Sequence, residues 1–383
     1  MFRKITALLI PLAFFLLPCL PQHSDTSSLT LVFGGDIMGH DEQIKGAWDE
    51  ATQSYNYEPT FRYIKPFIEE ADIAIGNLEV TLAGPAYTGY PQFSSPDELA
   101  KAASKAGFDV MIQANNHALD RGKKGFERTL RALDTLNLIH TGTFRNTEDR
   151  EKNYPLILEK NNIRIALLNY TYGTNGLEIA LPCIINRIDT VTIKNDLEKA
   201  GLANPDFVIV TMHWGEEYQR SENRQQRQLA SFLFRHGADA IIGSHPHVIQ
   251  PVRKHYPDPI DSSRYNLVVY SLGNFVSNQR AQYKDGGIMF SMHLIKTRDG
   301  TSVSDYNYMP YWVYRADLTG KSTFYVLPVD LYSQNEDHFN LLDHNQYKIT
   351  RFYEDTRQHL KGIPESPFFR GWKIKEGVPV FSE

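Results

Sequence analysis

Short apolar runs with strand character alternate with amphipathic helical patterns over the first three quarters of the chain. Helices are predicted where apolar residues recur every three or four positions, as at Phe126, Leu130 and Leu133. The predicted elements, in chain order, are a strand over Leu29–Phe33, a helix over Phe61–Glu70, a strand over Asp72–Ile75, a helix over Asp97–Ala106, a strand over Asp109–Gln113, a helix over Lys124–Leu136, strands over Arg164–Asn169 and Asp206–Met212, a helix over Arg224–Arg235, and strands over Ala240–Gly243 and Leu267–Leu272. This alternation favours an α/β sandwich.

The pattern changes near Ile288. Strand-like alternation takes over in Ile288–Ile295, Asn307–Tyr314 and Ser322–Pro328, and the stretch Asn335–Leu360 has a helical pattern. We therefore predict a main domain over residues 28–287. Residues 288–383 are predicted to form a strand-rich extension that ends in a helix and packs on the main domain.

The first residues have the features of an export signal. Arg3 and Lys4 precede the apolar run Ile5–Leu17, which is shorter than the ~20 apolar residues that a membrane span requires. A cleaved signal over residues 1–23 is therefore predicted, and with it an exported protein at the periplasm or cell surface. Cys19 follows a sequence that loosely resembles a lipoprotein signal, so a lipid anchor at Cys19 is the alternative. An uncleaved anchor helix is disfavoured by Pro11 and Pro18.

Composition narrows the range of partners. The chain of 383 residues is 42% hydrophobic and has a formal net charge of -5, which gives no sign of nucleic-acid binding and no basic run for an anionic membrane. Membrane contact is expected only through the N-terminal signal or anchor. The second of the two cysteines, Cys183, is expected to be an inert packed residue.

Five clusters of acids, amides and histidines each follow an apolar run that is predicted to be a strand. They are Gly34-Gly35-Asp36, Gly76-Asn77-Leu78-Glu79, Asn115-Asn116-His117, His213-Trp214-Gly215-Glu216-Glu217 and Gly243-Ser244-His245-Pro246-His247. Because the carboxyl ends of parallel strands meet at one edge of a sheet, such side chains can gather there. Carboxylates, amide oxygens and imidazoles are metal ligands, so the series predicts a metal site.

Each cluster also has a simpler structural interpretation. Asp36 could cap a turn or helix instead of binding a hard cation. Asn77 and Glu79 could be a turn residue and a surface acid, and a strand-end histidine such as His213 is often structural. His245 and His247 form the strongest pair, since two imidazoles on a proline-stiffened turn can face one centre.

The run from Asn115 to Asp120 suggests a division of roles. The Asn116 side-chain oxygen suits a hard metal, whereas His117 is predicted to protonate a leaving oxygen. Asp120 could fix the tautomer of that imidazole or cap the next helix. A nucleophile elbow, a phosphate-binding P-loop and a Cys-x-x-Cys pair are all absent from the sequence.

The clusters, in this order and together with Ser271-Leu272-Gly273-Asn274-Phe275, resemble the CapA family of poly-γ-glutamate capsule synthesis proteins. That family is similar to a divergent branch of the calcineurin-like metallophosphoesterases, and the match runs from about Leu31 to Ser277. The resemblance implies a four-layer α-β-β-α sandwich. It implies a metal cluster built from Asp36, Glu79, Asn116, His213, His245 and His247, with His117 as the histidine that assists the leaving group. One departure is Met38, where phosphoesterases have the histidine of Asp-x-His.

From this resemblance we predict an exported protein of capsule or envelope-polymer biosynthesis that acts as a two-metal hydrolase. Two divalent ions ~3.5–4 Å apart would activate water, and Mn, Fe, Zn and Mg are not distinguished. The predicted catalytic residues are His117 and Asp120, and Asn77, Glu217, Tyr218 and Arg121 are predicted to contact an envelope polymer or phosphoester. Cleavage or transfer at a γ-glutamyl amide and a non-catalytic assembly role with a relic site remain alternatives. Other capsule-synthesis proteins are candidate partners.

Overall fold

The computed structural model describes residues 26–257, 260, 264–318 and 320–382. The predicted signal segment 1–23, with Cys19, lies outside the described residues, so export and lipidation stay predictions. Within the described residues, no helix is both long and apolar enough to cross a membrane.

The first sheet has eight strands in the order β18-β17-β16-β1-β4-β5-β6, and β15 also pairs with β1. Its strands are β1 (Ser27–Ile37), β4 (Ile73–Leu78), β5 (Val110–Ile112), β6 (Ile139–Thr141), β15 (Asn274–Val276), β16 (Gly286–Thr297), β17 (Gly300–Leu318) and β18 (Lys321–Pro328). β1, β4, β5 and β6 run parallel, whereas β16, β17 and β18 are antiparallel to their neighbours. The predicted boundary at residue 287 therefore falls inside β16, which pairs with β1; the boundary itself stays a prediction.

The second sheet has six strands in the order β13-β14-β12-β11-β9-β8. They are β8 (Leu156–Lys160), β9 (Ile163–Thr171), β11 (Phe207–His213), β12 (Ala240–Ser244), β13 (Val252–His255) and β14 (Asn266–Val269). The four central strands are parallel, and the edge strands β8 and β13 are antiparallel. Three two-stranded ribbons pair β2 (Trp48–Asp49) with β3 (Ser54–Tyr55), β7 (Thr143–Phe144) with β10 (Ile184–Ile185), and β19 (Trp372–Lys375) with β20 (Val378–Phe381).

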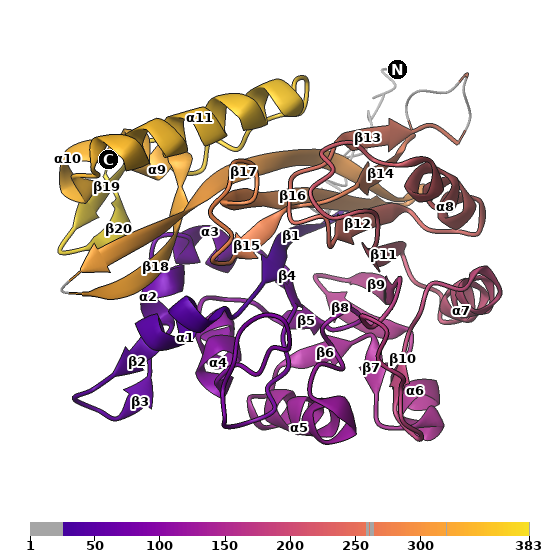
Figure 1. Ribbon diagram of the computed structural model, residues 1–383. Helices are drawn as coiled ribbons and strands as arrows, with labels where there is room; N and C mark the ends of the chain where they lie inside the picture. The colour runs from indigo at the N-terminus through magenta and orange to yellow at the C-terminus, as the bar shows by residue number, and fades with distance from the viewer. Residues whose placement is uncertain (1–25, 258–259, 261–263, 319, 383) are drawn as a thin grey trace, which may run out of the picture.

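Helices cover the outer faces of both sheets (Figure 1). They are α1 (Asp41–Ala47), α2 (Glu58–Phe61), α3 (Lys65–Glu69), α4 (Asp97–Lys105), α5 (Gly122–Thr135), α6 (Thr147–Asn153), α7 (Thr190–Leu202), α8 (Arg224–Arg235), α9 (Val329–Ser333), α10 (Glu336–Phe339) and α11 (Asp343–His359). The predicted α/β class and four-layer sandwich are confirmed. The single helix predicted over Phe61–Glu70 is wrong, because Pro66 lacks an amide proton and lies instead in the first turn of the separate helix α3.

The sheets pack through alternating side chains. Along β11, Phe207 and Ile209 belong to the large core between the sheets, whereas Val208 and Val210 pack in the cluster that contains residues of α7 and α8. This period of two is what a strand buried on both faces requires. The packing brings the strand ends of both sheets to one place.

An aspartate at the start of four parallel strands sets the register with the neighbouring strand. The carboxylates of Asp72, Asp109, Asp206 and Asp239 each accept a hydrogen bond of 2.8 Å from one backbone amide of the adjacent strand. The backbone amide of each aspartate in turn donates to a carbonyl of that strand. Two of these aspartates lie in each sheet, so both halves begin their strand pairing in the same way.

Candidate metal centre

The candidate centre lies where the carboxyl ends of strands from both sheets meet. The first sheet supplies Asp36 near the end of β1 and Glu79 directly after β4. The second sheet supplies His213, the last residue of β11, and the two histidines 245 and 247 that follow β12. All five side chains are buried. The topology therefore brings together residues up to 211 positions apart.

Asn77 lies beneath the two carboxylates and orients them. Its Nδ2 donates to Asp36 Oδ1 at 2.8 Å and lies 3.4 Å from Glu79 Oε2. Its Oδ1 accepts from Asn115 Nδ2 at 3.2 Å, and that same group also donates to the Leu78 carbonyl. Asn77 is 1% exposed and supports the ligands. A substrate contact by Asn77 stays a prediction.

The loop that carries two of the histidines has a strained backbone. His245 and His247 have φ values of 98° and 57°, a region that L-residues rarely adopt and that the surrounding structure must enforce. The Tyr218 amide donates to the Pro246 carbonyl at 2.8 Å, and His247 Nδ1 lies 3.1 Å from Asp36 Oδ2. These contacts aim both rings at the carboxylates.

Two groups of side chains have the spacing of metal sites. Glu79, His213 and His245 form one group, Asp36, Glu79 and His247 form the other, and within each group the ligand atoms lie within 4.8 Å of one another. Glu79 is the member of both. The buried atoms Glu79 Oε1 and His245 Nδ1 have no hydrogen-bond partner among the residues that the structure describes, which is costly unless another group completes them. This mixed oxygen and nitrogen donor set fits divalent cations.

The electrostatics of the site call for positive charge. Burial lowers the pKa of His213 to about 3 and that of His245 to about 2, so both rings are neutral and keep a lone pair for a ligand. Burial and the nearby Asp36 raise the pKa of Glu79 well above its ordinary range. Burial alone would lower the pKa of His247, but Glu79 and Asp36 outweigh it and raise that pKa to about 9. A protonated His247 thus supplies the charge that a cation would supply.

Asn116 and His117 have different surroundings. Asn116 Oδ1 lies 2.8 Å from His213 Nε2, at the edge of the first group of ligands. His117 Nδ1 lies 2.7 Å from Asp120 Oδ2, and the same oxygen accepts from the Phe93 amide at 2.7 Å. Asp120 therefore orients the imidazole rather than capping a helix, since Arg121 is the residue that precedes α5.

A cavity of about 450 Å³ opens beside this pair. It is lined by Tyr90, Pro91, Gln92, Asn116, His117, Asp120, Asn175, Leu177 and Glu217. Of the predicted substrate-contacting residues, Glu217 lines this cavity. Tyr218 is 45% exposed, with its ring 6.2 Å from that of His247, and Arg121 faces a different cavity.

Sequence reasoning missed several supporting residues. Ser244 Oγ lies 3.0 Å from His213 Nδ1, and the Tyr172 ring packs 4.5 Å from that of His245. Asn274 Nδ2 donates to the His247 and Lys284 carbonyls. Ser244 and Asn274 belong to sequence motifs named above, where they lie next to candidate metal ligands. That position could have identified them as supporting residues. No sequence signal marks Tyr172.

Met38 stands where phosphoesterases have a histidine, and the nearby His40 does not take its place. Met38 is buried, and His40 precedes α1, where its Nδ1 lies 3.1 Å from Gln43 Oε1. Burial lowers the pKa of His40 to about 4. Among the described residues, His40 belongs to neither ligand group, so it does not replace the missing histidine.

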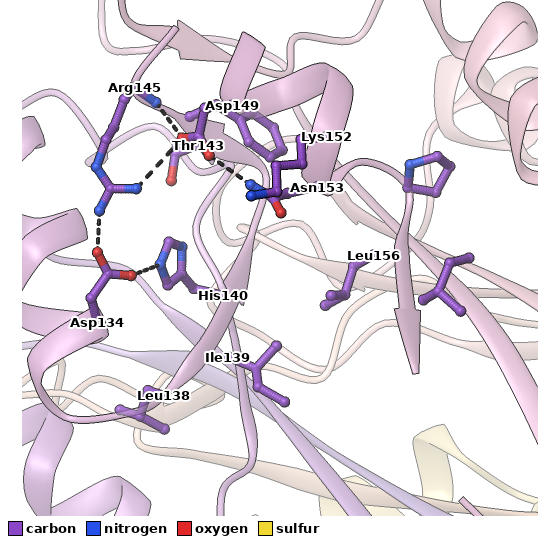
Figure 2. A pocket seen from close by; sticks show the side chains of 13 residues that line it. Asp134, Leu138, Ile139, His140, Thr143, Arg145, Asp149, Lys152, Asn153 and Leu156 are labelled. Carbon is purple, nitrogen blue, oxygen red and sulfur yellow. Dashed lines mark hydrogen bonds and ion pairs between the residues drawn. The ribbon is translucent and has the colours of Figure 1, made fainter. Parts of the chain in front are cut away.

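A separate cavity of about 460 Å³ contains none of the predicted site residues (Figure 2). Four of its side chains pair with one another: Arg145 contacts Asp134 and Asp149, and His140 Nε2 lies 3.1 Å from Asp134. Lys152 also lines the cavity.

Comparison with known proteins shows the family. The profile of the bacterial capsule synthesis protein PGA_cap matches residues 30–279. The capsule biosynthesis protein CapA of Bacillus anthracis is 31% identical over 297 residues, 74% of this chain and 68% of the relative. The PGA biosynthesis protein CapA of Bacillus subtilis is 29% identical and covers 82% of this chain and 74% of the relative. The chain belongs to the PGA_cap family, and the predicted resemblance is confirmed.

Two solved structures show weaker likeness. The NAD nucleotidase of Haemophilus influenzae is 11% identical with a TM-score of 0.48, over 89% of this chain and 64% of that one. The calcineurin-like phosphoesterase YfkN of Bacillus subtilis is 13% identical with a TM-score of 0.44, over 74% of this chain and 90% of that one.

Proposed function

We propose that this protein is an exported, metal-dependent hydrolase of the phosphoesterase type that acts in biosynthesis of a capsule or related envelope polymer. One observation carries the proposal: Glu79 belongs to both ligand groups, and its buried Oε1 has no hydrogen-bond partner in the described part of the chain. Family membership supports the role in capsule synthesis.

Six residues would hold two divalent ions: Asp36, Glu79, Asn116, His213, His245 and His247. Such ions supply Lewis acidity that polarises the scissile group and lowers the pKa of water. The protein holds its carboxylates in place through Asn77, which donates to Asp36 at 2.8 Å. The central position of Glu79 suits a carboxylate shared between two ions.

His117 is the proposed proton donor. Asp120 accepts from Nδ1 and stabilises the imidazolium, which leaves Nε2 to give its proton to the leaving oxygen. Phe93 supports this pair twice, because its amide donates to Asp120 and its ring packs edge-on against His117 at 4.7 Å. His117 and Asp120 thus line the cavity in a fixed orientation.

A γ-glutamyl amide is the second candidate substrate class. The relative from Bacillus subtilis is named a PGA biosynthesis protein, which favours cleavage at an amide of a γ-linked glutamate polymer by the same centre. Phosphoester hydrolysis releases an alcohol together with the phosphate-bearing product, whereas amide hydrolysis releases shorter glutamate chains. The products therefore separate the two chemistries.

The test is turnover of an alkyl phosphodiester, whose alkoxide leaving group needs a proton, and of poly-γ-glutamate by protein supplied with Mn or Zn, with metal content measured on each sample. The His117→Ala variant should lose about 10²–10⁴-fold in kcat with its metal content unchanged. The exposed His338→Ala is the control. Unchanged turnover in His117→Ala would refute the proton-donor role, and no turnover of either substrate by metal-loaded protein would favour a non-catalytic assembly factor.

A further inference from the structure

A third cavity, which lies along α5, is strongly basic. It has a volume of about 380 Å³ and lies between α5 and the segment 83–86. Its lining is Ala83, Gly84, Pro85, Ala86, Ser94, Arg121, Lys124, Gly125, Arg128 and Arg131, which includes four cations and no acid. The chain as a whole has a net charge of -5, so this concentration of positive charge runs against the overall balance.

The four cations form a row along one face of α5, here called the α5 basic stripe: Arg121, Lys124, Arg128 and Arg131. Their spacing of three, four and three residues places them on the same side of a helix, over about 15 Å of its length. Like charges at this spacing destabilise a helix by repulsion. A row of this kind is favourable only when negative groups lie against it.

The protein compensates only one of the four charges. Arg128 binds Asp97 with both guanidinium nitrogens, at 2.5 and 2.8 Å. Arg121 donates to neutral oxygens, the Ala86 carbonyl and Thr88 Oγ1. Lys124 and Arg131 are exposed, and neither forms an ion pair with any residue that the structure describes. The cavity in Figure 2 differs, because its arginine, Arg145, forms ion pairs with two aspartates.

The stripe begins at the residue that follows the His117–Asp120 pair. Arg121 directly follows Asp120, which orients His117. The Arg121 guanidinium holds the segment 86–88, and residues 90–92 of the same loop line the cavity beside His117. One loop thus forms a wall of both cavities, and a chain leaving the metal centre over this loop would meet Arg121 first.

We infer that the α5 basic stripe is a binding site for a linear polymer that carries a carboxylate on each repeat, and that it holds the units next to the one in the metal centre. Evenly spaced anions along such a chain would neutralise the free charges of Lys124 and Arg131. That one unit of the polymer lies in the metal centre rests on the proposed function. Binding of the polymer to the stripe does not. Polyphosphate shares the anionic repeat and is the competing ligand.

The experiment measures binding of fluorescently labelled poly-γ-glutamate oligomers and of polyphosphate to the full chain by anisotropy at several salt concentrations. The variant Lys124→Glu/Arg131→Glu reverses two exposed charges without disturbing the fold. Lys101→Glu/Lys361→Glu changes the net charge equally at exposed lysines outside the cavity. Metal content and turnover are followed separately, with His245→Ala as the variant that disrupts the metal centre.

Stripe reversal should weaken oligomer binding about tenfold or more, and the control pair should change it less than twofold. Binding should persist in His245→Ala, which separates a failure of the stripe from a failure of the metal centre. Equal weakening by both double variants, no effect of the stripe variant, or stripe-dependent preference for polyphosphate would each overturn the inference.

Discussion

The charge on Asp120 offers a sharp test of how His117 is held. The Asp120→Asn substitution keeps an oxygen that can accept from both His117 Nδ1 and the Phe93 amide, each now at 2.7 Å. It removes only the negative charge. The two side chains are 4% and 1% exposed, so solvent does little to screen the change.

The size of the effect follows from the hydrogen bond. A bond to a charged group contributes about 1.5–3 kcal/mol and a neutral one about 0.5–1.5 kcal/mol. Losing the charge therefore costs about 1–1.5 kcal/mol of imidazolium stabilisation, which is about tenfold in kcat. The Asp120 charge acts on the protonated imidazole and not on the contacts that bind substrate, so KM should change little.

The assay is steady-state hydrolysis of an alkyl phosphodiester, whose leaving group needs the proton, with metal content measured on the same samples. The matched control is Asp134→Asn, which alters an exposed histidine–aspartate pair in the cavity of Figure 2. Full kcat in Asp120→Asn at normal metal content would show that Asp120 does not stabilise a proton donor. A loss of turnover that merely followed a loss of metal would also refute the reasoning.

Three further predictions concern the supports of the site and the fold. Ser244→Ala removes the partner of His213 Nδ1 and should weaken metal affinity about 10–100-fold by competition with a chelating dye; unchanged affinity would count against an orienting role. Gly35→Ala should lower the free energy of unfolding by several kcal/mol in urea denaturation, because a Cβ there would lie 2.0 Å from a backbone carbonyl oxygen. Gly201→Ala, in open space on α7, should raise that free energy by about 0.5–1 kcal/mol. Equal effects of the two variants would contradict this packing. Burial raises the pKa of Asp239 from 3.8 to about 6, so the folded state keeps this proton longer than the unfolded state, and stability relative to Asp239→Asn should fall by about 1–3 kcal/mol as the pH rises from about 4 to about 6. Parallel stability–pH curves for the two proteins would reject that assignment.

The sequence predicts where the parallel strands end, and the reason is physical. An apolar run followed by Gly-Gly-Asp or Ser-His-Pro-His marks a strand that leaves the sheet at its carboxyl end, and all such ends of one sheet lie on one edge. The structure accordingly gathers Asp36, Glu79, His213, His245 and His247. Their catalytic and ligand roles stay predictions.

Long-range pairing could not be read in the same way. The alternation after Ile288 predicted strands, but nothing local shows that β16 pairs with β1 and extends the first sheet. Likewise, Tyr172 approaches His245 only because β9 lies beside β11. Such contacts depend on strand order, which a local pattern does not contain.

The metal content of the protein tests the central claim most directly. Elemental analysis of purified protein supplied with Mn or Zn, beside the His245→Ala variant, should find about two ions per chain and a loss of bound metal in the variant. Protein that binds no divalent ion under these conditions would contradict the account, because the buried Glu79 oxygen and the neutral imidazoles around it would then have no ligand to hold.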